Sequence, residues 1–273
     1  MKRNNKKEMA KNVILSGIIL VLFSICVIQL NVGDDTINNV VTSVTGDCKI
    51  EWGLKRNNNH ERPDMGEKNK QILENNGGIC LGKELEKKVY LTFDSGYEAG
   101  FIGNILDVLK QNNIKATFFI TSHYLNTASE LVERMINEGH IIGNHTVNHK
   151  SMPSISNEEI ESEVMRLHQA VFEKFNYEMK YIRPPKGEYS ERTLKKCEEL
   201  GYKTVMWSFA YCDWDEKKQP SQESAKKIII NNLHPGEIML LHSNSKTNSE
   251  VLDYIIKETR NQGYEFRTLD EFE

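Results

Sequence analysis

Short apolar runs alternate with stretches of helical periodicity from about residue 87 to the C-terminus. Runs such as KVYLTFD and KATFFIT are typical of buried strands, whereas GFIGNILDVLKQNN places its apolar residues on one helix face. We expect strands at 88–94, 115–121, 140–145, 180–185, 203–209, 237–243 and 264–272. We expect helices at 100–113, 128–139, 156–175, 190–201, 221–233 and 248–263. This alternation predicts the α/β class, with a distorted (β/α) barrel of about seven parallel strands.

The N-terminal third follows a different pattern. Residues 12–32 are apolar and uncharged, and a basic flank, MKRNNKKEMAK, precedes them. A stretch of roughly twenty such residues can cross a bilayer with its basic flank inside, so 1–32 is expected to be a membrane anchor or a cleaved signal peptide. Residues 33–86 are polar and Asn-rich, an expected linker and N-terminal extension packing on the barrel, and 87–273 is the expected catalytic domain. In either case, residues beyond about 33 are expected to function outside the cytoplasm.

The composition of the chain argues against several classes of function. The formal net charge is -4, which provides no basic excess for neutralising phosphates and argues against a nucleic-acid partner. The five cysteines are scattered and form no CxxC pair, so neither a zinc knot nor a redox motif is expected. An external location permits disulfides, but the sequence fixes no pairing.

Polar residues gather where the expected strands end. Asp94 ends the first strand, His145 and His149 follow the third, Arg183 ends the fourth, Asp213 follows the fifth, and His242 closes the sixth. In a (β/α) barrel the carboxyl ends of the strands converge on one face, where reactive groups lie. The pattern therefore predicts one site built from five separate segments.

The segment GNHTVNHK is a candidate metal site. His145 and His149 are four residues apart, so on one helical turn both rings would face the same side. Gly143 and Asn144 would allow a sharp turn after the strand. Zinc suits imidazole and oxygen ligands and leaves a position open for water. The remaining histidines, which we expect at the surface or in packing roles, are His60, His123, His140, His168 and His234.

Five motifs in order resemble one enzyme family. TFDSGYE, HTVNH, RPPKG, CDW and LLHS together resemble the polysaccharide deacetylases, that is, the NodB-homology or carbohydrate esterase 4 family. Within that family, WGLKRNNNHERPD, LTFDSGYEAG and RPPKGEYS look like the delta-lactam-biosynthetic de-N-acetylases of spore-forming bacteria. Those relatives act on N-acetylmuramic acid in spore-cortex peptidoglycan. The resemblance covers about residues 50–272.

The resemblance implies a role for each motif residue. Asp94 matches the base that takes a proton from a metal-bound water, His242 matches the acid that protonates the leaving amine, and His145 and His149 match the metal ligands. Arg183 matches the arginine that pairs with the base, and Asp213 the carboxylate that orients the acid. At Lys186 the backbone N–H would help to hold the oxyanion, while Trp214 and Leu240 match residues that frame the acetyl methyl group.

One position departs from the family pattern. Most relatives carry a second Asp directly after the base as the third metal ligand, whereas this chain has Ser95. The lactam-type relatives also commonly have a neutral residue there. Since a hydroxyl is a poorer ligand for a divalent cation than a carboxylate, Ser95 is at best a weak ligand, and we expect a weakly held Zn²⁺.

The expected function is therefore removal of acetyl groups from N-acetylmuramic acid in peptidoglycan glycan strands, a step toward muramic-delta-lactam in spore cortex. The membrane is the expected second partner, an amidase is a candidate for acting upstream, and the forespore intermembrane space is the expected location. Lys55, Arg56 and Arg62 lie in a loop that could meet the glycan's carboxylates. Two alternatives remain open: a deacetylase of N-acetylglucosamine in peptidoglycan or chitooligosaccharides, and an inactive glycan-binding relative.

Overall fold

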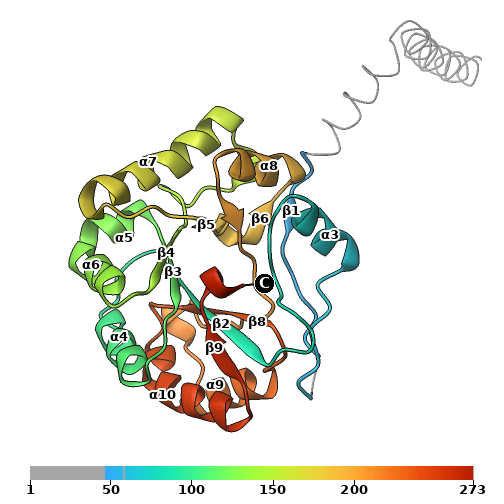
Figure 1. Cartoon of the computed structure of the whole chain (residues 1–273), viewed down its shortest axis with the longest axis vertical. Helices are drawn as coiled ribbons and strands as arrows, with labels where there is room; N and C mark the ends of the chain where they lie inside the picture. Colours follow the sequence, from blue (N-terminus) through green and yellow to red (C-terminus); the bar gives the residue numbers. More distant parts are fainter. Residues whose placement is uncertain (1–46, 58, 273) are drawn as a thin grey trace, which may run out of the picture. The chain divides into compact units, whose positions relative to one another are not determined.

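The computed structural model describes residues 47–57 and 59–272, and its centre is a seven-stranded sheet in which every pairing is parallel (Figure 1). The strand order is β7-β5-β4-β3-β2-β8, and β9 pairs with the first half of β2. The strands are β2 (Lys88–Ser95), β3 (Thr117–Ile120), β4 (Ile141–Asn144), β5 (Tyr181–Ile182), β7 (Lys203–Thr204), β8 (Glu237–His242) and β9 (Glu265–Arg267). The α/β prediction, with about seven parallel strands, is confirmed.

Helices surround the strands and cover their outer side (Figure 1). They are α4 (Ile102–Gln111), α5 (Ser122–Thr127), α6 (Ser129–Asn137), α7 (Asn157–Phe175), α8 (Glu191–Glu199), α9 (Gln222–Asn231) and α10 (Lys246–Asn261). Each long helix turns an apolar stripe toward the sheet; in α10 the buried residues include Val251, Leu252, Ile255 and Ile256. Ser156 and Ser190 cap α7 and α8, and Ser190 forms a reciprocal capping box with Thr193.

Three expected strands, at 180–185, 203–209 and 264–272, are much shorter than the sequence predicted, and in the first only β5 is regular strand. In the segment 203–209 only β7 is regular strand, because the chain then changes partners. Met206 N–H donates to the Ile79 carbonyl, and two residues later Ser208 N–H donates to the Ile238 carbonyl of β8. The isolated bridge between Phe209 and Met239 thus links the segment after β7 to β8. In 264–272, β9 gives way to a 3₁₀ turn, η4 (Leu269–Glu271).

Residues 48–86 pack against the barrel through a second, smaller core. This segment contains β1 (Ile50–Glu51) and α3 (Glu67–Asn75), and β1 pairs antiparallel with β6 (Glu188–Tyr189). The buried residues of this core are Trp52, Met65, Leu73, Cys80, Tyr189, Leu194 and Met206. Trp52 N–H donates to the Gly187 carbonyl at 2.9 Å, and its ring Nε1–H donates to the Trp207 carbonyl at 2.9 Å. The extension therefore supports the RPPKG segment from behind.

The predicted anchor at 1–32 lies outside the described residues. Within 47–57 and 59–272, none of the helices is both long and apolar enough to span a bilayer. Two of the cysteines, Cys80 and Cys197, are buried, and burial raises the pKa of each thiol to about 12, so both are protonated near neutral pH.

Gly143 has a different role from the one expected. It lies inside β4 rather than in a turn, and a methyl group added there would lie 2.4 Å from Phe119 Cδ1. The Phe119 ring in turn lies against the Arg183 guanidinium, whose central carbon is 4.2 Å from the ring centroid. The absence of a side chain at Gly143 therefore gives Phe119, and with it Arg183, the space it occupies.

We predict that Gly143→Ala lowers the free energy of unfolding by about 1–3 kcal/mol, because the extra methyl overpacks the Phe119 ring. The matched control is Gly103→Ala on α4, where an added methyl meets no atom within 4 Å; it should leave stability unchanged or raise it by up to about 1 kcal/mol. Urea unfolding of both variants measures the difference. Equal stabilities would contradict this account of Gly143.

Candidate active site

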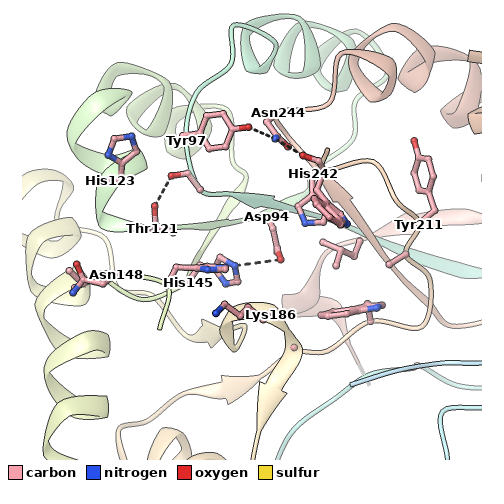
Figure 2. A pocket seen from close by; sticks show the side chains of 18 residues that line it. Asp94, Tyr97, Thr121, His123, His145, Asn148, Lys186, Tyr211, His242 and Asn244 are labelled. Carbon is pink, nitrogen blue, oxygen red and sulfur yellow. Dashed lines mark hydrogen bonds and ion pairs between the residues drawn. The ribbon is translucent and has the colours of Figure 1, made fainter. Parts of the chain in front are cut away.

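A pocket of about 960 Å³ opens at the carboxyl ends of the strands (Figure 2). The parallel register of β2 and β8 sets Asp94 directly beside His242, so the ends of two neighbouring strands deliver the expected acid and base together. Seven of the predicted site residues line the pocket: Asp94, His145, His149, Lys186, Trp214, Leu240 and His242. Arg183 and Asp213 are buried and contact these residues from behind.

The carboxylate of Asp94 is held by Arg183. Arg183 Nη1 donates to Asp94 Oδ1 at 2.8 Å, and the arginine is 0% exposed. Its other two nitrogens also have partners, since Nη2 donates to the Thr92 hydroxyl at 2.9 Å and Nε donates to the Val205 carbonyl at 3.1 Å. Burial alone would raise the pKa of Asp94, but the charge of Arg183, assisted by His145, outweighs it and holds that pKa below its usual value. Asp94 is therefore ionised near neutral pH.

The two candidate ligand histidines lie in the loop after β4, with ring centroids 4.8 Å apart. The expected helical turn is absent; instead Thr146 and His149 adopt positive φ angles of 68° and 55°, which bring the rings together. His145 Nδ1 lies 2.8 Å from the Arg183 carbonyl, an acceptor, so this nitrogen carries the proton. The lone pair of Nε2 is then free, and Nε2 lies 3.6 Å from Asp94 Oδ2.

The protonation states of both histidines suit a metal. Burial lowers the pKa of His145. Burial, together with the repulsion that a second protonated ring beside His145 would meet, lowers the pKa of His149 to about 4. Both rings are therefore neutral near pH 7, as metal ligands must be. Ser95, the third candidate metal ligand, is placed less favourably. It is fully buried and outside the pocket lining, and its hydroxyl has no hydrogen-bond partner in the described chain.

The two neutral imidazoles thus fit a divalent cation, but within the described residues they lack a third strong ligand. Among residues 47–57 and 59–272, no group of three or more His, Cys, Asp or Glu side chains is arranged to hold a metal ion. Ser95 directly follows Asp94 at the end of β2, and its buried hydroxyl, without a partner in the part of the chain that the structure describes, is the remaining candidate for a weak ligand.

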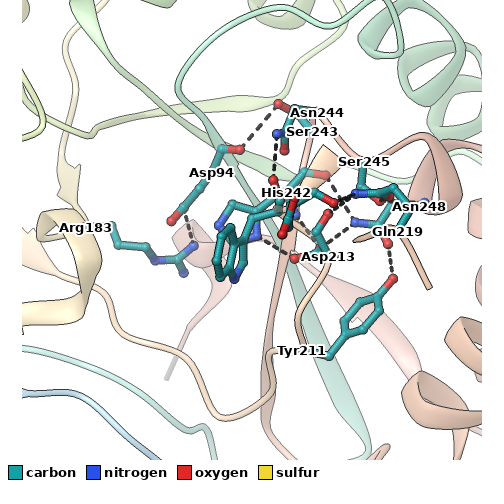
Figure 3. A network of polar contacts seen from close by, with 12 residues as sticks. Asp94, Arg183, Tyr211, Asp213, Gln219, His242, Ser243, Asn244, Ser245 and Asn248 are labelled. Carbon is teal, nitrogen blue, oxygen red and sulfur yellow. Dashed lines mark hydrogen bonds and ion pairs between the residues drawn. The ribbon is translucent and has the colours of Figure 1, made fainter. Parts of the chain in front are cut away.

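A network of polar contacts around Asp213 favours the protonated form of His242 (Figure 3). Its Nδ1 lies 2.7 Å from Asp213 Oδ1, and its backbone N–H donates to Asp213 Oδ2 at 2.8 Å. Burial lowers the pKa of His242, but the hydrogen bond and charge of Asp213, assisted by Asp94, outweigh it and raise that pKa above its usual value. Asn248 fixes this carboxylate by donating to Oδ2 at 2.6 Å. His242 is thus built to carry a proton.

The three predicted substrate-binding residues lie at different depths. Leu240, on β8, is buried in the pocket wall, whereas Trp214 is 57% exposed at the rim. Lys186 belongs to the 3₁₀ turn η2 (Pro185–Gly187) and has a φ of 61°. This left-handed conformation is uncommon for a residue with a side chain, and it is held between two buried prolines and Gly187.

Several site residues were not anticipated from the sequence. His123, assigned beforehand to a surface or packing role, is exposed but lines the pocket, as do Tyr97 and Asn244. Thr92 could have been found, since it lies two positions before Asp94 and thus on the same face of β2. Asn248 carries no comparable signal because its position on α10 follows only from the tertiary fold.

The basic loop does not reach the pocket. Lys55, Arg56 and Arg62 are absent from its lining. Arg62 Nη2 donates to the Gly82 carbonyl at 2.7 Å, and the Arg56 guanidinium lies 5.9 Å from the centroid of the Phe209 ring. These contacts give both arginines structural roles in the N-terminal extension.

Comparison with known proteins agrees with this geometry. A family model described as polysaccharide deacetylase matches residues 82–205. Over 223 residues the chain is 40% identical to the peptidoglycan-N-acetylmuramic acid deacetylase PdaA of Bacillus subtilis, which covers 81% of this chain and 85% of that protein. The chain belongs to the polysaccharide deacetylase family. It is therefore a carbohydrate deacetylase, an enzyme that hydrolyses an amide bond.

Two further comparisons concern the fold and the substrate for which a relative is named. A crystal structure of B. subtilis PdaA, described as a family 4 carbohydrate esterase, superposes with a TM-score of 0.81 at 39% identity, covering 83% of this chain and 97% of that one. A peptidoglycan-N-acetylglucosamine deacetylase of Bacillus cereus is 35% identical over 186 residues, covering 67% of this chain and 66% of that protein.

We predict that Asp213→Asn lowers the pKa of His242, because it removes the negative charge that offsets burial of the imidazolium. Activity that requires protonated His242 should then fall away at a lower pH than in the unchanged deacetylase. The pH dependence of kcat/KM gives this shift, and NMR titration of the His242 ring gives it independently. An unchanged His242 pKa in the variant would refute the role given to Asp213.

Proposed function

We propose that this deacetylase removes the acetyl group from N-acetylmuramic acid in the glycan strands of peptidoglycan, and that the freed amine leads toward muramic-delta-lactam in spore cortex. The supporting observation is the identity of 40% over 223 residues with a protein named for that activity, together with a fold that matches the solved structure of that protein at a TM-score of 0.81. We place the enzyme outside the cytoplasm on a membrane anchor, in the forespore intermembrane space, with an amidase exposing the muramic acid beforehand.

In the proposed reaction Asp94 is the general base. Its carboxylate is ionised and held by Arg183, so it can accept a proton from a water that attacks the acetyl carbon. A carboxylate whose pKa is below the usual range is a weak base, and it therefore requires a water made more acidic than bulk water. A bound divalent metal would supply this effect and would also polarise the amide carbonyl.

His145 and His149 are the residues that would hold that metal, through nitrogens left unprotonated near neutral pH. Zn²⁺ is the metal we propose, with water and the Ser95 hydroxyl as the weaker ligands. Since hydroxyl and water bind more weakly than a carboxylate, we expect this metal to be removed readily by chelators.

His242 is the proposed general acid. An amide nitrogen leaves poorly unless it is protonated, and His242 lies beside Asp94 with its pKa raised by Asp213. The proton that Asp94 accepts and the proton that His242 donates are therefore handled by different side chains. The Lys186 backbone N–H is assigned to the developing oxyanion, and Leu240 and Trp214 to the acetyl methyl group.

The second candidate substrate is N-acetylglucosamine in peptidoglycan or in chitooligosaccharides. It is favoured by the relative from B. cereus and by a chitooligosaccharide deacetylase of Sinorhizobium fredii that is 31% identical over 155 residues. The same base, acid and ligands would serve either sugar, because the acetamide group is identical in both.

We predict that the enzyme releases acetate from peptide-free glycan of alternating N-acetylmuramic acid and N-acetylglucosamine, and that mass spectrometry finds the lost acetyl groups on muramic acid. Asp94→Asn should reduce the rate by about 10²–10⁴-fold because the base is removed. The control is Asp107→Asn on α4, an exposed carboxylate outside the pocket. Acetyl loss only from N-acetylglucosamine would reject the proposed substrate, and full activity of Asp94→Asn would reject the proposed base.

We predict that Ser95→Asp tightens metal binding by supplying the missing carboxylate ligand. In the metal-free protein the same change should lower the melting temperature, because a carboxylate buried without a partner is destabilising. Adding Zn²⁺ should restore that temperature in the variant more than in the unchanged protein. Calorimetric titration with Zn²⁺ and thermal unfolding measure both effects, and an unaltered Zn²⁺ affinity would remove Ser95 from the proposed ligand set.

A further inference from the structure

Among the residues that the structure describes, Lys186 is the only Lys or Arg whose side chain lines the pocket. Its side chain is exposed, and within the described chain its ammonium forms neither a hydrogen bond nor an ion pair. Glu188, two residues later, is bound instead by Lys49, with Nζ 3.1 Å from Oε1. The pocket therefore holds a cation whose donors are left for something outside the protein.

The position of this cation is fixed by the backbone. Lys186 has a left-handed φ of 61°, and the following Gly187 is buried, with its carbonyl bound by Trp52 N–H. A methyl group at Gly187 would lie 2.7 Å from the Trp207 ring, so the turn has little room to shift. The N-terminal extension thus holds the start of the lysine side chain rigidly at the pocket wall.

The ammonium also lies near the reacting groups. Lys186 lines the same pocket as His145 and His149, and its charge is one of the causes that lower the pKa of His149. The guanidinium of Arg183 is fully buried and bound to Asp94, so it cannot meet a substrate, and the proton of His242 is assigned to the leaving amine.

The proposed substrate has an anion at a matching place. Muramic acid carries a lactyl carboxylate on the oxygen of C3, and the acetamide to be cleaved is on the adjacent C2. When the acetamide lies between Asp94 and His149, the carboxylate must lie only a few bonds away. N-acetylglucosamine has a plain hydroxyl at C3 and offers no such charge.

We propose that the Lys186 side chain binds the free lactyl carboxylate and thereby selects muramic acid over N-acetylglucosamine. This inference rests on the proposed function and adds to it the residue that distinguishes muramic acid from N-acetylglucosamine. The side chain is a specificity determinant, distinct from the oxyanion role assigned to the Lys186 backbone. Because an ammonium–carboxylate hydrogen bond is charge-assisted, its loss is expected to matter more than that of a neutral contact.

The test compares two forms of the same peptide-free glycan, one with free lactyl carboxylates and one with these groups converted to neutral methyl esters. Lys186→Met should reduce kcat/KM on the free acid by roughly 10- to 100-fold while changing it little on the ester. Lys186→Glu should reduce it further, and Lys186→Arg should retain most of it. The matched control is Lys227→Met on α9, an exposed lysine outside the pocket.

Added salt gives a second measurement. The kcat/KM of the unchanged enzyme on the free acid should fall as ionic strength rises, and that of Lys186→Met should fall less, since screening acts on the charge pair. An equal loss on acid and ester by Lys186→Met, with the protein folded by circular dichroism, would overturn the Lys186 inference while leaving the proposed function standing. Failure of the unchanged enzyme on both muramic substrates, with activity on chitooligosaccharide, would overturn the proposed function and this inference together.

Discussion

One fully buried arginine joins the parts of the reaction centre. The side chain of Arg183 holds the carboxylate of Asp94, and its backbone carbonyl fixes the proton of His145 on Nδ1. A buried charge is costly unless each of its donors is satisfied. Here the carboxylate, the Thr92 hydroxyl and the Val205 carbonyl meet the guanidinium, and the Phe119 ring lies against it. Only the forked, planar guanidinium could serve these partners at once, so lysine could not replace it.

The centre keeps its histidines in two different states. Next to Arg183, burial holds His145 and His149 neutral, with nitrogens that can accept a metal. On the neighbouring strand, Asp213 overcomes the same burial and favours the protonated form of His242. Because the parallel register of β2 and β8 sets Asp94 beside His242, a neutral pair and a proton donor flank one carboxylate. The difference arises because Nδ1 of His242 is hydrogen-bonded to the carboxylate of Asp213, whereas Nδ1 of His145 is hydrogen-bonded to a neutral carbonyl.

The sequence predicted much of this arrangement because parallel strands impose a rule. Residues that end such strands must meet at one edge, so the convergence of Asp94, His145 and His242 followed from the order of the elements alone. Contacts between distant segments had no such signal. Asn248 reaches Asp213 only because the first turn of α10 lies at the end of β8, where Asn248 also donates to the His242 carbonyl. The chain at 203–209 changes partners because the Ile79 carbonyl accepts from Met206 and the Ile238 carbonyl then accepts from Ser208. The left-handed turns at Thr146 and Lys186 were equally hidden, since neither residue type favours them.

For the proposed substrate, the neutral side chain at position 95 has an electrostatic consequence as well as its effect on the metal. A carboxylate there would strengthen the metal site, but it would also add a negative charge beside the pocket. Asp94 is already balanced by Arg183 and Asp213 by the protonated His242, so the site without a metal is close to neutral. A substrate that carries its own carboxylate next to the scissile amide would be repelled by a further fixed anion. On the proposed substrate, Ser95 would thus exchange metal affinity for an electrostatic environment that an anionic sugar can enter, and Lys186 would supply the positive charge that binds it.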